Sequence, residues 1–409
     1  MSRTACLSQG HFFENKFMST RSNTPQIDAI CKGSTTERGR AQGEAMAEMI
    51  RESAEAIHQL EAFALQSPWW LPYRAFVKLA DWKAERALRA GLSAELPEVW
   101  DRLIAMSRGS GVSLRRLALL NALEPVLSDL SACVTGLEAG CSAVAVGADR
   151  SGGHGPILAH NFDYLPLVQR FYCIRDERPA FGLRSLQFSM APMAGLVNGI
   201  NETGLAVTFN YAYTTDKARP APTISMRLGE VLERCRTVED ACDYLTRTSR
   251  WGSGLIMLAD ADGATASLEL TPTRHCIRSG ARQSIITHAN RVCGEPTSRV
   301  QLGMNAVYGK RSPRVLRGQR VHLSSESREQ ALRRIELNGE QNGAMLDPET
   351  LANRMADHGP SDSPSGLTLC MHSDYWHTTA CIQLLPEARQ LRISYSTACQ
   401  AQYMDFVIL

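Results

Sequence analysis

The chain has 409 residues, of which 44% are hydrophobic and 21% are charged. This is an ordinary globular composition, enough for a sizeable core in one or two domains. The formal net charge of +2 is too small to favour a nucleic acid or an anionic membrane as a partner, so we expect neither.

The 12 cysteines show neither the close pairs of a metal site nor the dense framework of a small secreted domain. We therefore expect free thiols in a reducing compartment. Residues 1–26 form a polar tail without a motif, and they lack the apolar region of a signal peptide. No apolar run approaches the length of a membrane span. These features predict a cytoplasmic protein.

Residues 27–140 are dominated by apolar residues at helical spacing. The pattern predicts a helix that Thr35 or Thr36 caps and that continues to about residue 57. Further helices are predicted over 72–92, 97–106 and 114–127. Pro97 suits a first helical position, and the Gly-Val-Ser before residue 114 gives the last helix a clear start. We expect a helix-rich N-terminal portion.

After residue 140 the pattern changes to short β-like runs interrupted by pairs of helices. Strands are predicted at 142–146, 157–160, 185–190, 205–211, 254–259, 266–270, 284–288, 368–372, 379–384 and 390–395. Helices are predicted at 224–235, 238–246, 328–337 and 348–355, and Thr237 with Asp240 forms a plausible capping box for the second of these. The order of elements indicates an α+β fold with two antiparallel sheets covered by helices.

Cys141 follows Gly140 at the head of the first of these strands. A turn rich in glycine and polar residues, 148–156, separates it from the next apolar run, so the two runs form a plausible hairpin. That hairpin would bring Asn161 and Asp163 back beside Cys141, an arrangement suited to nucleophilic chemistry. The alternative is a buried structural cysteine, which is common for free thiols.

The stretch GCSAVAV, with GPILAHNFDY after the turn, resembles the acyl-coenzyme A:isopenicillin N acyltransferase-like family of N-terminal nucleophile (Ntn) hydrolases, relatives of the choloylglycine hydrolases and penicillin V acylases. Three more segments are similar to family signatures and stand in the same order. They are ERGRAQGE at 37–44, GINETGLAVTFNY at 199–211 and ITHAN at 286–290. The resemblance runs from about residue 27 to the C-terminus, and it implies a four-layer αββα sandwich.

In that family a Gly-Cys bond cleaves itself, which implies cleavage between Gly140 and Cys141. The thiol would attack the carbonyl carbon of Gly140, a residue that tolerates the strained φ/ψ of such an attack. The freed α-amine, with an unperturbed pKa of about 7.7–8.0, would then take the thiol proton. The products would be an α-chain ending at residue 140, preceded by the 1–26 tail, and a catalytic β-chain of 141–409. Together they would form an αβ heterodimer.

The resemblance also implies roles for four polar residues. Asp163 would orient and stabilise the amine of Cys141, or alternatively act as a turn residue. Asn210 would hold a developing oxyanion, or simply end its strand. Asn290 would be a second donor near the amine or the scissile carbonyl, or a loop residue. Asn161 would support the site or the backbone.

One departure from the family concerns a late Ser-Arg-Gly, whose arginine is implicated near the nucleophile. The matching run here is SPSGLT at 363–368, without an arginine. Either Arg328 supplies the positive charge, or Arg328 lies on a solvated helix face and the enzyme works without that charge. The missing arginine weakens the case for acyl-coenzyme A and penicillin-type substrates.

His288, His372 and His377 are well separated in sequence and lack the spacing of metal ligands. We expect no metal and no cofactor. A papain-type protease with Cys141 and one of these histidines is a further alternative, but the flanking signature of its cysteine is absent.

These features together predict an Ntn-type cysteine amidohydrolase that acts on a linear C–N amide bond of a small acyl amide, through a thioester acyl-enzyme. We expect an apolar acyl pocket built partly from Trp69, Trp70, Phe162 and Tyr164, because aromatic side chains line many ligand pockets. One alternative is an acyltransferase that moves an acyl group from a thioester or amide to an amine. Another is an uncleaved, non-catalytic scaffold of the same fold.

Overall fold

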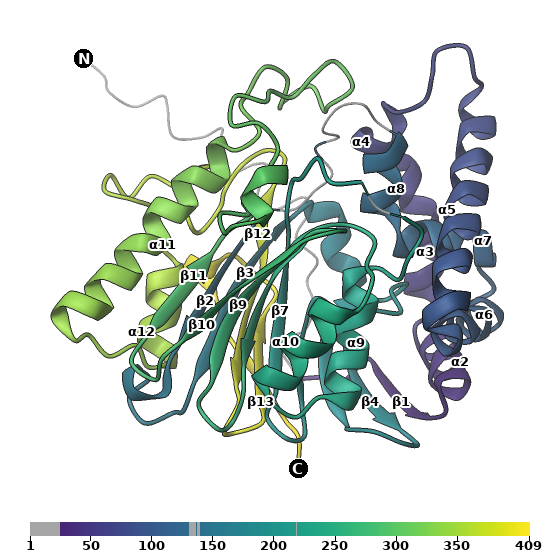
Figure 1. The fold of residues 1–409 in the computed structure, drawn as a ribbon. Helices are drawn as coiled ribbons and strands as arrows, with labels where there is room; N and C mark the ends of the chain where they lie inside the picture. The colour runs from purple at the N-terminus through teal and green to yellow at the C-terminus, as the bar shows by residue number, and fades with distance from the viewer. Residues whose placement is uncertain (1–24, 131–135, 137–139, 218) are drawn as a thin grey trace, which may run out of the picture.

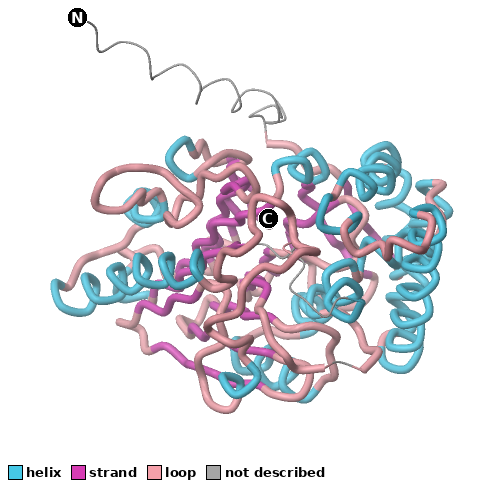
Figure 2. Tube along the Cα trace, turned by 90° about the horizontal axis from the view of Figure 1, so that it is seen from above, coloured by secondary structure: helices cyan, strands magenta, loops and turns pink. Residues whose placement is uncertain are grey.

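The computed structural model describes residues 25–130, 136, 140–217 and 219–409. Almost all of the predicted 1–26 tail lies outside these residues. Two β-sheets pack face to face between helices, and a further group of helices lies along one side (Figures 1 and 2). The predicted α+β fold with two sheets is confirmed.

The larger sheet has 8 strands in the order β1-β4-β5-β6-β7-β8-β9-β10. Neighbouring strands are antiparallel, except that β1 pairs with β4 in parallel. The strands are β1 (Ala29–Gly33), β4 (Tyr172–Pro179), β5 (Ser185–Met190), β6 (Asn198–Asn201), β7 (Ala206–Tyr211), β8 (Gly254–Ala259), β9 (Thr265–Leu270) and β10 (His275–Gly280).

The smaller sheet has 6 strands in the order β11-β2-β3-β12-β13-β14, all antiparallel. They are β2 (Gly140–Val146), β3 (Ile157–Tyr164), β11 (Ile285–His288), β12 (His377–Leu385), β13 (Gln390–Ser394) and β14 (Met404–Val407). Every residue of β2 and β3 is buried. One face of this pair meets β7 and β8 of the larger sheet and the other meets α11 and α12, which is why even the polar residues of β3, His160, Asn161 and Asp163, are buried.

Helices cover the outer face of each sheet, completing four layers (Figure 1). α9 (Ile224–Arg234) and α10 (Val238–Arg247) pack on the larger sheet, and α11 (Leu323–Asn342) and α12 (Pro348–Met355) pack on the smaller one. The capping box predicted for α10 is confirmed, since Thr237 accepts from the backbone of Asp240 and the Asp240 carboxylate accepts from that of Thr237. The predicted αββα arrangement is present.

The described residues from Thr35 to Leu130 form the lateral helical group. It comprises α2 (Thr35–Ala45), α3 (Ala47–Ala56), the short α4 (Glu61–Ala64), α5 (Tyr73–Glu95), α6 (Pro97–Ser110), α7 (Leu114–Asn121) and α8 (Leu123–Leu130). The single helix predicted over 114–127 is divided into α7 and α8 at Ala122. The cap of α2 is Ser34 rather than Thr35 or Thr36, because the Ser34 N–H donates to the Glu37 carboxylate at 2.7 Å and the Ser34 hydroxyl accepts from the Glu37 N–H at 3.3 Å.

Two further differences from the predicted elements have physical causes. The strand predicted at 368–372 is absent, because the Thr368 hydroxyl donates to the carbonyls of Ser365 and Cys370 and so folds the segment on itself. Strand β4 was not predicted because Arg175, Asp176 and Glu177 interrupt its apolar pattern. All three side chains are nevertheless buried in the fold.

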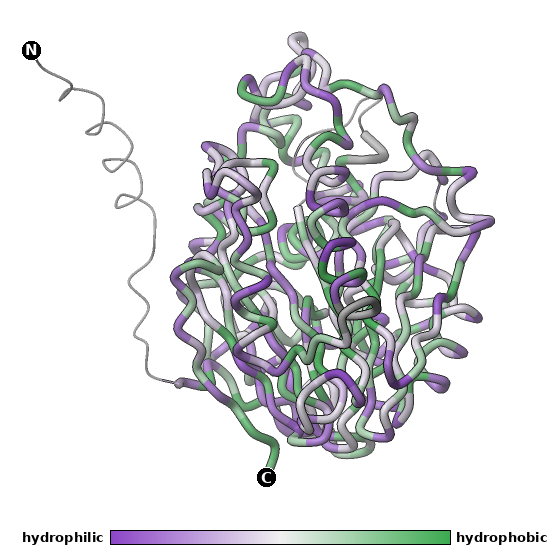
Figure 3. Tube along the Cα trace, turned by 90° about the vertical axis from the view of Figure 1, so that its left-hand side faces the viewer, coloured by the Kyte–Doolittle hydropathy of each residue, from purple (hydrophilic) through white to green (hydrophobic). Residues whose placement is uncertain are grey.

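The end of the chain around the last strand, β14, is hydrophobic and is drawn green at the C-terminus in Figure 3. Met404, Phe406 and Ile408 are buried there, alternating with exposed Val407 and Leu409. Among the described residues, no helix combines the length and apolarity that crossing a bilayer requires.

Candidate active site

Cys141 is the second residue of β2, and the predicted hairpin with β3 is confirmed. Gly140 pairs with Asp163 and Cys141 with Phe162 in the antiparallel register. The Cys141 side chain is buried, with 1% of the residue exposed. The register therefore places the nucleophile candidate and the acidic candidate on adjacent strands, as the sequence predicted.

Asn290 holds the backbone at the candidate cleavage point. The Cys141 N–H donates to Asn290 Oδ1 at 2.9 Å, and Arg328 Nη2 donates to the same oxygen at 2.8 Å. On its other side, Asn290 Nδ2 donates to the Tyr211 carbonyl at 2.9 Å. Because two donors converge on Oδ1 and an acceptor faces Nδ2, the orientation of this amide is determined by its surroundings.

Arg328 is a buried residue of this site. Its exposed fraction is 2%, although it lies on α11. Nη1 donates to the carbonyl of Cys141 and to the Ser142 hydroxyl, the latter at 3.0 Å, and it lies 4.0 Å from Asp163 Oδ2. The interpretation of Arg328 as a solvated helix residue was wrong. Arg328 places a positive charge beside Cys141 even though the run at 363–368 contains no arginine.

Asp163 is fully buried next to that charge. Its Oδ1 accepts from the Thr378 hydroxyl at 2.6 Å, whereas its Oδ2 has no hydrogen-bond partner in the described part of the chain. Burial raises the pKa of Asp163 from 3.8 to about 7, although Arg328 and Thr378 both act to lower it. Sequence reasoning missed Thr378 as a site residue. Only its pairing with Asp163 across β12 and β3 identifies it, and no local sequence pattern shows that pairing.

The Cys141 thiol is held in its neutral form in this intact chain. Burial raises its pKa well above 9.0, the negative charge of Asp163 raises it further, and the charge of Arg328 acts in the opposite direction. A base must therefore take the thiol proton before the sulfur can act as a nucleophile.

Gly140 lies in a closely packed part of the site. The backbone φ of Gly140 is not in the left-handed region. This angle therefore gives no support to the expected backbone strain at Gly140. A Cβ at this position would lie 3.0 Å from Met371 Cε and 3.4 Å from both Arg328 Nη2 and Asp163 Cβ. The absence of a side chain lets Met371, Arg328 and Asp163 approach the bond between Gly140 and Cys141.

The two other asparagines lie in different environments. Asn161 Nδ2 donates to the carbonyls of Met355 and Leu369 at 2.9 and 3.0 Å, so this side chain ties α12 and the following loop to β3. Asn210 Nδ2 donates to the Ala289 carbonyl at 2.9 Å, and its Oδ1 is buried without a hydrogen-bond partner in the described residues. Asn161 therefore supports backbone, while Asn210 braces the residue before Asn290.

The histidines of the papain-type alternative are engaged elsewhere. His288 Nδ1 lies 2.9 Å from the Ser267 hydroxyl, and burial lowers the pKa of His288 well below 6.5. His372 Nε2 lies 3.3 Å from the sulfur of Cys370, not that of Cys141. These contacts give no support to a Cys–His pair that includes Cys141.

A largely apolar cavity of about 130 Å³ opens beside Cys141. The predicted pocket residues Phe162 and Tyr164 line it, but Trp69 and Trp70 do not; they are 96% and 66% exposed. Other apolar lining residues from the two sheets and nearby segments are Leu167, Val168, Phe171, Met190, Val197, Phe209, Tyr211, Ile224 and Trp251. The helical group contributes Ala56, Ile57, Leu60, Leu120 and Leu123. Residues that precede the Gly140–Cys141 bond in the sequence and residues that follow it therefore both line the cavity.

Three solved structures are similar at low identity. An N-acylethanolamine-hydrolyzing acid amidase ortholog from Caenorhabditis elegans is 14% identical, with a TM-score of 0.40 over 66% of this chain and 100% of that one. A mutant of the conjugated bile acid hydrolase from Clostridium perfringens is 10% identical, with a TM-score of 0.38 over 66% of this chain and 97% of that one. The penicillin V acylase of Agrobacterium tumefaciens is 12% identical, with a TM-score of 0.36 over 66% of this chain and 86% of that one.

No curated protein matches the sequence. A family model does: that of acyl-coenzyme A:6-aminopenicillanic acid acyl-transferase matches residues 150–395. The match spans more than half of the chain and agrees with the resemblance noted from the sequence. The protein therefore belongs to the acyl-coenzyme A:6-aminopenicillanic acid acyl-transferase family.

Proposed function

We propose that the protein is an Ntn-type cysteine amidohydrolase that cleaves itself between Gly140 and Cys141 and then hydrolyses a linear amide with an apolar acyl group. The observation that carries this proposal is the position of Cys141. Its backbone N–H, the future α-amine, is held by Asn290 beside Asp163 and Arg328, and its side chain lines the apolar cavity.

In the cleavage step, the Cys141 sulfur forms a bond to the carbonyl carbon of Gly140 and the C–N bond between the two residues breaks. The leaving nitrogen keeps the electron pair and takes a proton, and water then hydrolyses the thioester to leave a carboxylate on Gly140. Asp163, with a pKa of about 7, suits the role of the base that accepts the thiol proton near neutral pH. Arg328, which donates to the Cys141 carbonyl, keeps the strand in place during this step.

After cleavage the α-amine of Cys141 replaces Asp163 as the base for the thiol. Asn290 Oδ1 and Asp163 Oδ2 are the acceptors available to orient that amine and to stabilise its protonated form. The thiolate attacks the substrate carbonyl to give an acyl-enzyme, and water releases the acid. Asn210 carries a second N–H besides the one bonded to Ala289, and we assign to it the stabilisation of the developing oxyanion.

The fragments 1–140 and 141–409 stay together as an αβ heterodimer in this proposal. Glu177 of β4, in the catalytic portion, accepts from Arg38 at 3.2 Å and from Arg102 at 2.5 Å, both in the helical portion. All three side chains are buried. Burial raises the pKa of Glu177, but Arg102, Arg175 of the same strand and Arg38 together lower it to about 2. Strand β1 also remains paired with β4. Among the described residues, separating the chains would leave Arg175 as the one remaining arginine beside Glu177 and would break the buried pairs that Glu177 forms with Arg38 and Arg102, which is unfavourable.

The cavity favours an aliphatic or aromatic acyl chain, because hydrophobic residues form most of its wall. We rank hydrolysis above acyl transfer. The described cysteines are all free thiols, which supports a reducing compartment such as the cytoplasm.

The test is the intact mass of the purified recombinant protein beside a Cys141→Ala variant. The 45.0 kDa chain, divided in proportion to length, would give fragments of roughly 15 and 30 kDa, the larger beginning at Cys141. The variant should remain a single chain, whereas a matched control, Cys173→Ala, which removes another buried strand cysteine, should be cleaved normally.

A single 45.0 kDa species from the unmodified chain under all conditions would sink the cleavage mechanism and favour the uncleaved scaffold. If cleavage occurs, the two catalytic alternatives are separated by adding an amine acceptor to a panel of N-acyl amides and acyl thioesters. Hydrolysis predicts release of the free acid at a rate that the amine does not change. Acyl exchange that outcompetes water would identify a transferase.

A further inference from the structure

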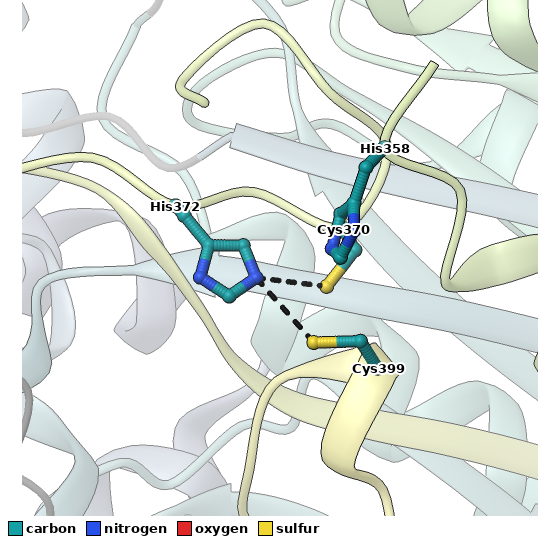
Figure 4. Close-up of side chains that lie close together, drawn as sticks. All are labelled: His358, Cys370, His372 and Cys399. Carbon is teal, nitrogen blue, oxygen red and sulfur yellow. Dashed lines mark hydrogen bonds between the residues drawn. The ribbon is translucent and has the colours of Figure 1, made fainter. Parts of the chain in front are cut away.

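A second group of reactive side chains lies away from Cys141, at the junction of three segments that are distant in the sequence. His358 follows α12, Cys370 and His372 precede β12, and Cys399 lies in the short 3₁₀ turn Ala398–Gln400 before β14. One ligand atom from each of these four residues lies within 4.8 Å of all the others (Figure 4). Sequence spacing gave no sign of this, because tertiary folding brings the segments together.

Two of the separations are close to those of tetrahedral zinc coordination. With Zn–S of about 2.3 Å and Zn–N of about 2.0–2.1 Å, a tetrahedral ion holds a sulfur and a nitrogen ligand roughly 3.6 Å apart. His372 Nε2 lies 3.3 Å from Cys370 Sγ and 3.6 Å from Cys399 Sγ. The cluster could therefore close around an ion with small side-chain movements.

The surroundings of His358 also suit a ligand. Its Nδ1 lies 3.3 Å from the Asp362 carboxylate, while its Nε2 is buried and has no hydrogen-bond partner among the described residues. A carboxylate on one ring nitrogen fixes the tautomer that presents the other nitrogen to a metal, as is general for histidine ligands. The ring of His377 packs edge-on against that of His372, with centroids 4.8 Å apart, and limits its rotation.

We propose that His358, Cys370, His372 and Cys399 bind a structural Zn²⁺ ion. Two thiolates and two imidazoles form the soft donor set that selects zinc over magnesium or calcium. Four protein ligands complete a tetrahedral shell and leave no open position, so the ion stabilises structure and takes no part in amide chemistry. Its binding releases the thiol protons of Cys370 and Cys399.

The proposed ion would brace the loop that reaches the candidate active site. The described residues 356–376 contain no helix or strand, and Met371 lies between two of the ligands. The Met371 N–H donates to the Thr378 hydroxyl at 2.8 Å, and that hydroxyl donates to Asp163 at 2.6 Å. The zinc would thus hold the segment from which the Met371 N–H positions the Thr378 hydroxyl that donates to Asp163.

The test starts from the unmodified full chain, purified without chelators under reducing conditions. Elemental analysis should find about one zinc per chain. After the zinc is removed by chelation and dialysis, added Co²⁺ should produce the visible d–d bands of tetrahedral coordination and a near-ultraviolet thiolate-to-cobalt charge-transfer band. Added zinc should then displace the cobalt and abolish both. The cobalt spectrum needs no variant, so it remains decisive if a substitution prevents folding.

Cys399→Ser is the first variant because its side chain is exposed, and Cys293→Ser is the matched control because it removes another exposed cysteine outside the cluster. Cys399→Ser should lose most of the zinc and about half of the thiolate-to-cobalt intensity, whereas the control should change neither. Three results would each overturn the proposal. They are no zinc and no cobalt bands in the reduced protein, equal metal loss in both variants, or a Cys370–Cys399 disulfide in a protein that binds no metal when reduced.

Discussion

The buried carboxyl of Asp163 makes the stability of the uncleaved chain depend on pH in a direction opposite to that of most acids. We consider Cys141→Ala, which keeps the chain intact, with and without a second substitution, Asp163→Asn. The asparagine keeps an acceptor for the Thr378 hydroxyl but cannot ionise. The difference between the two proteins isolates the ionisation of Asp163, because other titrating groups are common to both.

The sign follows from the raised pKa. An acid whose pKa rises from 3.8 in the unfolded chain to about 7 in the folded chain binds its proton more tightly when folded. Its contribution to stability is fully present below pH 3.8 and is lost as the pH rises through about 7. At about 1.4 kcal/mol per pH unit, a shift of about three units amounts to roughly 4 kcal/mol.

The assay is urea unfolding of both proteins at several pH values from 4 to 8, followed by tryptophan fluorescence with a check that unfolding reverses. The chain with Asp163 should lose up to about 4 kcal/mol of unfolding free energy relative to the Asp163→Asn chain as the pH rises. Parallel pH profiles, or a rise in the relative stability of the Asp163 chain, would refute the reasoning. The second outcome would mean that Arg328, 4.0 Å away, outweighs burial.

Three further substitutions test other parts of the site. Arg328→Met should slow self-cleavage, seen as retained full-length chain on a gel, and lower the unfolding free energy by about 1–3 kcal/mol, because it removes the donor to the buried Cys141 carbonyl and Ser142 hydroxyl; exposed Arg333→Ala on the same helix should cost no more than about 0.5 kcal/mol. Val197→Phe, which fills the cavity, should lower kcat/KM for long acyl chains by roughly tenfold or more while cleavage proceeds, and equal losses for short and long chains would argue against an acyl pocket there. Asn161→Ala leaves two buried carbonyls without donors and should destabilise by about 1–3 kcal/mol for each; a cleaved, folded variant with unchanged kcat would support its structural role, and loss of kcat alone would contradict it.

The sequence by itself determined most of the helices, the strands with a clear hydrophobic period, and the nucleophile candidate. The strands at β5 and β8 and the helix α12 have the predicted bounds, because hydrophobic period and capping residues are local signals. The hairpin of β2 and β3 was also predictable, since a segment rich in glycine and polar residues separates two apolar runs, whereas the register that sets Asp163 opposite Gly140 came from the structure. Motif resemblance added the roles of Asn210 and Asn290, which remain predictions.

Only the tertiary structure decided what surrounds Cys141. Local pattern could not separate a solvated Arg328 from a buried one, because its burial depends on how α11 packs against β2. Thr378 became a partner of Asp163 through cross-strand register, 215 residues away in sequence.

Local sequence pattern was also unable to predict which residues line the pocket and which side chains form the proposed zinc site. Trp69 and Trp70 are exposed although aromatic residues usually favour burial, and local hydrophobicity does not specify which surface is covered. His358 and Cys399 stand 41 positions apart in the numbering and meet only because α12 and the turn before β14 flank the same end of the smaller sheet. Long-range packing, which is governed by the whole chain, decides such contacts.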